Sequence, residues 1–182
     1  MTLLESKEIK QYTKMPHFQL ESVSGPHFKS ANIKAHKGLL IVFTCNHCPY
    51  AIAIWPRLIE LAIKNKERGI ETVAINPNIH PDYPEDAPEK MKEKVSEWKI
   101  PFPYLVDEDQ RTAQQYNAQC TPDLYLVDNQ NRLVYHGRLD DNWQNPDDVK
   151  EQDLQQAINT LIEDRPPLEN QVPSMGCSIK WQ

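Results

Sequence analysis

Glycine is scarce in this chain, which has five glycines and fifteen prolines among 182 residues. Glycine frees the backbone and proline fixes φ, so this ratio predicts many rigid turns and few flexible hinges. Long apolar runs are missing too, and none approaches the roughly 18 residues that a membrane-spanning helix needs. We therefore expect no membrane partner.

Positive charge is not in excess either. Lysine and arginine number 20 against 26 aspartates and glutamates, which gives a net charge of −6, and no basic run stands out. Because nucleic acids are bound through a basic face, we expect no nucleic-acid partner. Residues 1–15 are polar and charged and lack the apolar stretch of a signal peptide, so the expected compartment is the cytoplasm.

Cysteine is limited to four residues. In the cytoplasm thiols stay reduced, which favours catalysis or metal binding over a structural disulfide framework. The length and the ordinary content of hydrophobic (39%) and charged (25%) residues predict one soluble globular domain. We place this domain at residues 1–165 and expect a proline-rich tail, residues 166–182, packed on it.

Strand and helix patterns alternate after an initial β-hairpin. The hairpin is expected over residues 17–33, with its turn at Ser24-Gly25-Pro26. The further elements are strands at 38–43, 70–76 and 102–107, helices at 49–68, 89–99, 108–119 and 147–164, and a second hairpin at 124–139. Alternating βαβ units predict an α/β fold, with a central mixed sheet and helices on both faces.

The helix expected at 49–68 shows an apolar stripe at helical spacing. Its members are Ile52, Trp55, Ile59 and Ile63. Pro56 lies inside this helix and is expected to kink it.

The stretch "FTCNHCPY", residues 43–50, carries the most specific motif. Its two cysteines, Cys45 and Cys48, fall between a buried strand and the next helix. In open α/β sheets functional groups gather at that carboxyl end of the strands. Residues three apart share one helix face, so these two cysteines can close a redox-active disulfide.

The expected roles of the two cysteines follow from the helix start. Unpaired N–H groups and the helix dipole favour a thiolate at Cys45, and a protonated His47 would tune its pKa further. Cys48 is expected one turn inside the helix and more buried. Cys45 would then be the exposed attacking sulfur, and Cys48 would resolve the mixed disulfide.

A Cys-x-x-Cys motif can also be half of a zinc site, but such sites need a second pair of ligands. The other cysteines, Cys120 and Cys177, are single and far apart. They are expected to be small buried hydrophobes, with a role as additional thiols kept as an alternative. No metal is therefore predicted, although a non-enzymatic metal-binding or chaperone-like module using Cys45, His47 and Cys48 stays an alternative.

Four segments together resemble a known family. They are "PHFQLESVSG" (16–25), "GLLIVFTCNHCP" (38–49), "QCTPDLYLVDNQNRLVYHGRLDD" (119–141) and "PSMGCSIKW" (173–181). The chain resembles the peroxiredoxin-like branch of the thioredoxin-fold superfamily, the alkyl hydroperoxide reductase/thiol-specific antioxidant proteins. The last segment resembles the ending of a small bacterial group of uncharacterised peroxiredoxin-like proteins.

This resemblance implies a thioredoxin-like fold with an N-terminal β-hairpin extension. It also implies a cis peptide bond at Thr121–Pro122, opposite the two cysteines, with both residues on the substrate side. The expected substrate is a protein or small-molecule thiol or disulfide, with peroxide as a further class. A dithiol protein would supply electrons, and no organic cofactor is implied.

The resemblance bears on peroxide chemistry as well. Peroxiredoxins carry Pro-x-x-x-Thr-x-x-Cys, and aligning Cys48 with that cysteine puts Cys45 in place of the Thr and Ile41 in place of the Pro. Asp123 follows Pro122 with an unsuitable charge, and Arg138 is the arginine available to assist. The main expectation is therefore an oxidoreductase that cycles a Cys45–Cys48 disulfide. The alternative is a thiol peroxidase using one of these cysteines, resolved by Cys48, Cys120 or Cys177.

Overall fold

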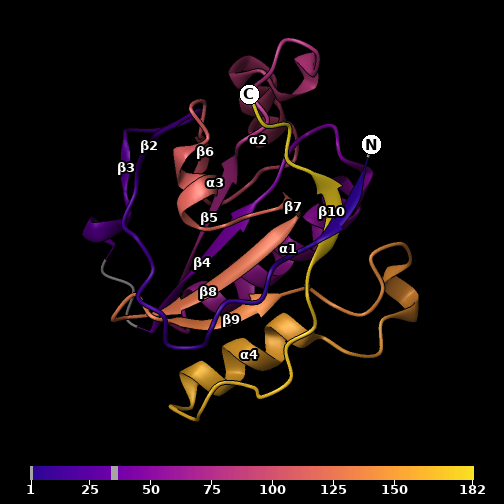
Figure 1. Cartoon of the computed structure of the whole chain (residues 1–182). Helices are drawn as coiled ribbons and strands as arrows, with labels where there is room; N and C mark the ends of the chain where they lie inside the picture. Colours follow the sequence, from indigo (N-terminus) through magenta and orange to yellow (C-terminus); the bar gives the residue numbers. More distant parts are fainter. Residues whose placement is uncertain (1, 34–36) are drawn as a thin grey trace.

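The computed structural model describes residues 2–33 and 37–182. Its main layer is a seven-stranded sheet in the order β3-β2-β6-β5-β4-β8-β9 (Figure 1). The bounds of its strands are β2 Gln19–Ser22, β3 Phe28–Lys29, β4 Gly38–Phe43, β5 Ile70–Asn76, β6 Tyr104–Val106, β8 Asp123–Asp128 and β9 Leu133–Gly137. A second sheet has the order β1-β10-β7, with β1 at Leu3–Glu5, β7 at Cys120–Thr121 and β10 at Met175–Ser178.

The main sheet is mixed, as expected. Strand β4 runs parallel to β5, and β5 runs parallel to β6. On the other side β4 pairs antiparallel with β8, which forms the second predicted hairpin with β9. Strands β2 and β3 form the predicted N-terminal hairpin, and β2 joins the sheet by antiparallel pairing with β6. The predicted architecture is therefore confirmed.

Four α-helices flank the sheet: α1 Pro49–Lys66, α2 Pro88–Glu97, α3 Arg111–Gln115 and α4 Asp153–Ile162. Short 3-10 turns lie at η1 Ser30–Asn32, η2 Pro84–Asp86 and η3 Pro146–Asp148. The helices expected at 108–119 and 147–164 are therefore shorter than predicted. The helix expected at 147–164 is divided: Asn145 caps η3 by accepting a hydrogen bond from the N–H of Asp147, and η3 forms a separate turn before α4 begins.

Strand β4 lies in the middle of the core and is buried along its whole length. Side chains alternate between the two faces of a strand. Leu40 and Val42 accordingly pack in the cluster that includes α1, α2 and α4, whereas Leu39, Ile41 and Phe43 pack in the cluster that includes α3 and the N-terminal segment. Coverage on both faces explains why the strand reads as a continuous apolar run.

Helix α1 is continuous through Pro56, and only part of the apolar stripe seen in the sequence is buried. Trp55 is fully buried, but Ile52 and Ile63 are 37% and 58% exposed. The buried face consists of Ala51, Ile54, Trp55, Leu58, Leu61, Ala62 and Asn65. The helical spacing of the four apolar residues is confirmed, and Trp55 and Ile59 pack in the core, but spacing alone did not select the buried face because apolar residues occur around much of this helix.

The C-terminal segment returns from α4 to the sheet, where β10 lies between β1 and β7 (Figure 1). Gly176 of β10 is required at this contact, because a Cβ atom there would lie 2.1 Å from the carbonyl oxygen of Thr121. The division into a domain at 1–165 and a tail at 166–182 stays a prediction. Among the described residues, none of the helices is both long and apolar enough to cross a membrane.

Candidate active site

The Cys-x-x-Cys segment joins the end of β4 to the start of α1. Cys48 is the N-cap of α1, and the helix begins at Pro49. The expectation that Cys45 starts the helix and Cys48 lies one turn inside it is therefore wrong. Proline is favoured at the first helical position because it has no N–H to leave unbonded. The helix dipole consequently acts most directly on Cys48.

Both motif cysteines are fully buried, at 0% exposure. The expected exposure of Cys45 is therefore wrong. The Sγ atom of Cys45 lies 3.2 Å from the hydroxyl oxygen of Thr121, and the Sγ atom of Cys48 lies 3.1 Å from the carbonyl oxygen of the same residue. One residue of β7 thus contacts both sulfurs.

The peptide bond between Thr121 and Pro122 is cis, as the sequence predicted. The strand edge that carries Thr121 is occupied by the chain itself, because Cys177 of β10 is its antiparallel partner. A role of Thr121 and Pro122 in substrate binding stays a prediction.

Cys177 is the third thiol of the site. Its Sγ atom lies 2.8 Å from the Sγ atom of Cys48, and it packs in one buried cluster with Cys45, Cys48 and Ala51. The contact joins residues 129 positions apart, and no local sequence signal reveals it. The main expectation, that Cys177 is only a small buried hydrophobe, did not foresee its contact with Cys48.

Cys120 has a different position, although it neighbours Thr121. Its Sγ atom lies 3.7 Å from the carbonyl oxygen of Pro122, and it is not a member of the cluster around Cys48. Burial raises the pKa of the Cys120 thiol, which favours the neutral form. Its surroundings match the expected small buried hydrophobe.

The two motif cysteines differ in acidity. Burial, together with the hydrogen bond to Cys48 and the negative charge of Asp86, raises the pKa of Cys45 well above its ordinary value. The hydrogen bond from Cys45 lowers the pKa of Cys48 to about 5, helped by Cys177 and by the N–H of Ala51. The expected low pKa of Cys45 is therefore wrong, and the thiolate belongs to Cys48.

His47 is held by Asp86 at the end of η2. Its Nδ1 atom is hydrogen-bonded to Oδ2 of Asp86, and its ring packs against Tyr83 with 4.4 Å between ring centroids. The other carboxylate oxygen of Asp86 accepts the backbone N–H of Asn46 at 2.5 Å and the amide of Asn76 at 3.0 Å. Sequence reasoning missed Asp86, which lies in a segment read as a loop.

A half-buried cation interacts electrostatically with the site. Burial lowers the pKa of Lys94 of α2, while the negative charges of Cys45 and Asp86 oppose this effect. Tyr104 donates its hydroxyl to the side-chain oxygen of Asn46 at 3.1 Å, and burial raises its pKa. Tyr104 thus contacts the motif loop directly, and neither residue was predicted.

Among the described residues, one group offers ligand atoms that a metal ion could share. These are Cys45, His47 and Asp86, whose donor atoms lie within 4.8 Å of one another. The group differs from the expected set, because Asp86 takes the place of Cys48. Its His and Asp members are already hydrogen-bonded to each other.

Two residues considered for peroxide chemistry have other partners. Asp123 is buried and contacts the ring of His136 at 2.8 Å and the hydroxyl of Tyr125 at 3.0 Å. Arg138 forms an ion pair with Asp153 of α4 at 3.0 Å. Neither contact directs these charges to the cysteines.

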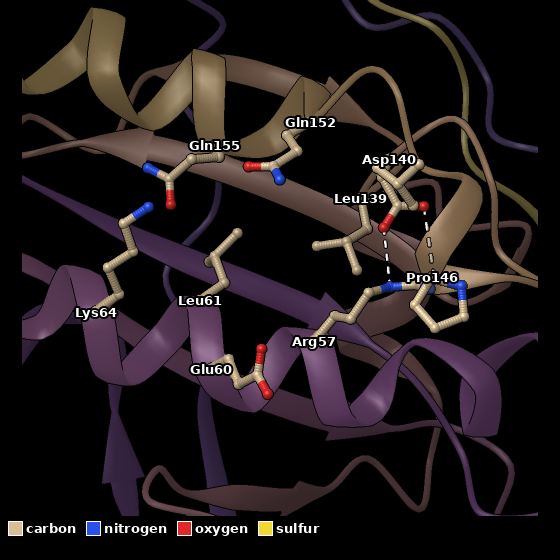
Figure 2. Close-up of a pocket in the computed structure, with 10 residues that line it drawn as sticks. Arg57, Glu60, Leu61, Lys64, Leu139, Asp140, Pro146, Gln152 and Gln155 are labelled. Carbon is tan, nitrogen blue, oxygen red and sulfur yellow. Dashed lines mark hydrogen bonds and ion pairs between the residues drawn. The ribbon is translucent and has the colours of Figure 1, made fainter.

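Two cavities of about 240 Å³ lie near α1. One adjoins the site, because Pro122, Trp143 and Met175 are among the residues that line it. The other lies between α1 and the start of α4, where Arg57 points toward Asp140 (Figure 2). Neither a cysteine nor Thr121 or Pro122 lines the second cavity, so it is separate from the thiol site.

The comparison with protein families gives one match of broad extent. Residues 12–136 match the AhpC/TSA family, which is more than two thirds of the chain. The chain belongs to the AhpC/TSA family. This membership supports a redox function of the thioredoxin fold, of the thiol–disulfide oxidoreductase or the peroxidase type.

Solved structures agree with this assignment. An uncharacterized conserved protein from Geobacillus kaustophilus is 40% identical, with a TM-score of 0.93, and the match covers 100% of this chain and 97% of that chain. A hypothetical protein from Sinorhizobium meliloti 1021 is 37% identical, with a TM-score of 0.92 and 98% of each chain covered.

A more distant structure shares the fold. The peroxidoxin BcpB from Mycobacterium tuberculosis is 15% identical, with a TM-score of 0.62, and the match covers 87% of this chain and 99% of that chain. The search of functionally curated proteins gave no significant match. The thioredoxin-like fold of this AhpC/TSA member is thus established.

Proposed function

We propose that the protein is a thiol–disulfide oxidoreductase that cycles a Cys45–Cys48 disulfide. The observation that carries this proposal is the buried pair of thiols bound to one residue, Thr121, with the pKa of Cys48 lowered to about 5. A thiolate is the nucleophile in disulfide exchange, and it needs a second thiol nearby to resolve the product. The pair supplies both.

The proposed reaction begins at Cys48. Its thiolate attacks one sulfur of a substrate disulfide, which breaks that bond, releases one substrate thiolate and forms a mixed disulfide. Cys45 then loses its proton and attacks the Cys48 sulfur, which releases the second substrate thiolate and forms the Cys45–Cys48 disulfide. Two electrons pass to the substrate, and a dithiol protein returns them. These roles are the reverse of those expected from the sequence.

Access to the site requires local movement, because neither sulfur is exposed. The cavity beside Pro122 adjoins the cis bond that follows Thr121, and its lining combines apolar Trp143 and Met175 with charged residues such as Arg138 and Asp141. The apolar part of this lining favours a peptide or small molecule that carries an apolar group next to its disulfide. The expected cytoplasmic location stays a prediction.

A thiol peroxidase is the second candidate, favoured by the AhpC/TSA match. Here the Cys48 thiolate would attack a peroxide oxygen, release an alcohol or water and become a sulfenic acid, which Cys45 would convert to the disulfide with loss of water. Ile41 and Cys45 replace the Pro and Thr of peroxiredoxins, and Arg138 is paired with Asp153. We therefore expect slow peroxide reduction.

One set of assays tests both candidates. Wild type, Cys45→Ser and Cys48→Ser are compared for exchange with oxidised glutathione and for hydrogen peroxide consumption, in the same preparations. Wild type should form the Cys45–Cys48 disulfide and consume peroxide slowly. Cys48→Ser should abolish turnover, and Cys45→Ser should abolish the Cys45–Cys48 disulfide. Cys120→Ser is the matched control, because its sulfur lies outside the thiol cluster. Peroxide consumption faster than disulfide exchange would favour the peroxidase.

A further inference from the structure

Strand β10 brings a third thiol onto the site through backbone pairing. Cys177 is the antiparallel partner of Thr121 on one side and of Leu3 on the other. The preceding residue, Gly176, allows β10 to approach the backbone at Thr121, where a side chain would collide. The position of Cys177 is therefore fixed by two strands and by one close backbone contact.

The geometry around Cys48 is that of a central sulfur between two thiols. Cys48 packs with Cys45 in one buried cluster and is hydrogen-bonded, at an Sγ–Sγ distance of 2.8 Å, to Cys177. A disulfide has an S–S bond of about 2.05 Å, so the remaining gap is well under 1 Å. Both outer thiols can reach the same central sulfur.

We propose that Cys177 is a third redox-active thiol, and that the site exchanges between a Cys45–Cys48 and a Cys48–Cys177 disulfide. This inference rests on the proposed oxidoreductase function. In the exchange the Cys177 thiolate attacks the Cys48 sulfur, the Cys48–Cys177 bond forms, and the Cys45–Cys48 bond breaks. Cys45 leaves as a thiolate and takes up a proton in place of the one that Cys177 lost. The step is an isomerisation and needs no oxidant or reductant.

The charges of the site favour this exchange once Cys48 is oxidised. In the reduced protein, burial and the neighbouring Cys48 raise the pKa of Cys177 to about 12, and Lys180 opposes them. When Cys48 enters a disulfide it loses its negative charge, so one cause of the raised pKa disappears. Once Cys45 has left, burial favours its protonated form, which disfavours its return attack on Cys48.

The exchange would change what the site can do. It keeps the two-electron oxidation in the Cys48–Cys177 bond and returns Cys45 to the thiol form. It also links the N-terminus of α1 covalently to the C-terminal segment. A mixed disulfide on Cys48 would then have two possible resolving thiols.

Cys45→Ser is the variant that tests the new bond directly. The variant is treated with oxidised glutathione, quenched with acid, alkylated and digested with trypsin without reduction. Trypsin leaves Cys45 and Cys48 on one peptide, residues 38–57, because no lysine or arginine lies between its ends. Cys177 falls on another peptide, so a Cys48–Cys177 bond appears as a cross-link of two peptides.

We expect Cys45→Ser to form this cross-link with loss of bound glutathione. Cys45→Ser/Cys120→Ser should do the same, whereas Cys45→Ser/Cys177→Ala should keep glutathione on Cys48. A lasting glutathione adduct in Cys45→Ser, equal to that of Cys45→Ser/Cys177→Ala, would overturn the inference. Circular dichroism and thermal unfolding of each variant identify any that does not fold, and Cys177→Ser then replaces Cys177→Ala.

The disulfide-linked peptides of the oxidised wild-type protein test this inference and the proposed function separately. Oxidised wild type should yield both the 38–57 peptide with its internal disulfide and the cross-link to Cys177. The internal disulfide without any cross-link would reject the third thiol and leave the proposed function intact. A cross-link without the internal disulfide would reject the proposed Cys45–Cys48 cycle and retain the reactivity of Cys177.

Discussion

The ring of His47 is hydrogen-bonded through Nδ1 to the carboxylate of Asp86, a residue 39 positions further along the chain. The sequence suggested that His47 acts on Cys45 as an added positive charge. In the structure the imidazole ring faces a buried carboxylate, and Asp86 itself raises the pKa of Cys45. The pair, rather than the histidine alone, sets the electrostatics of the motif.

This pair leads to a prediction on redox potential. We expect a wild-type Cys45–Cys48 potential of roughly −150 to −240 mV, above the value of about −270 mV for thioredoxin, because a stabilised thiolate favours the reduced form. His47→Pro should lower the potential, since Asp86 would then act unopposed against a thiolate. Equilibration with glutathione buffers measures this. A wild-type potential at or below that of thioredoxin, or no change in the variant, would contradict the role of His47.

Asp86→Asn tests the other half of the pair. Removing the negative charge should lower the pKa of Cys45, because Asp86 is one of the groups that raise it. The measurement is the pH dependence of alkylation of Cys45, compared between Cys48→Ser and Cys48→Ser/Asp86→Asn so that one motif thiol titrates. An equal or higher pKa in the double variant would show that Asp86 does not act on Cys45.

The reduced protein should hold its thiolate on Cys48. We expect thiolate absorbance in the ultraviolet to titrate with an apparent pKa of about 5 in wild type. Cys48→Ser should lose this titration, and Cys45→Ala should raise the pKa because Cys45 supplies the largest stabilising hydrogen bond. Cys120→Ser serves as the control. A titration that persists in Cys48→Ser and is lost in Cys45→Ala would show that Cys45, and not Cys48, carries the thiolate.

The low pKa of Cys48 also predicts a pH dependence of stability. Its pKa is about 5 in the folded protein against 9.0 for an ordinary thiol, so between these values the unfolded chain binds a proton that the folded protein lacks. The free energy of unfolding should therefore rise with pH across this window, by up to about 1.4 kcal/mol per pH unit, and the contribution is lost as pH falls toward 5.

Denaturant unfolding of the reduced protein at pH 5, 6, 7 and 8 measures this dependence. Cys48→Ser and the oxidised protein show the pH dependence of stability that comes from all other titrating groups, because neither has a thiol to ionise at position 48. Parallel curves for reduced wild type and Cys48→Ser would show that the Cys48 thiolate does not contribute.

The close contact of Gly176 with Thr121 gives a prediction about β10. Gly176→Ala should lower the free energy of unfolding by about 1–3 kcal/mol, because the new Cβ would lie 2.1 Å from a backbone oxygen. Displacement of β10 should also speed alkylation of Cys48. Gly25→Ala is the matched control, since its Cβ would meet only the Ser22 hydroxyl at 3.7 Å. Equal effects of the two substitutions would show that β10 tolerates the added atom.

The local sequence pattern was sufficient to predict several structural features of this protein. The strands at 38–43 and 70–76 have the predicted bounds, because a continuous apolar run between turn residues reports burial on both faces. The cysteine motif lies at the predicted strand–helix junction, and the cis bond falls at Thr121–Pro122. These features depend on residues close together in the chain or on a family motif that spans them.

The tertiary structure decided which groups act together. The hydrogen bond from Cys45 lowers the pKa of Cys48 most, and Cys177 and the N–H of Ala51 add to it, because the helix begins at Pro49 and Cys48 is its N-cap. Asp86 and Cys177 reach the motif from 39 and 129 positions away. Short segments such as η2 and β10 have no periodic pattern of their own, so only the pairing of strands and the packing of loops could place these residues against the cysteines.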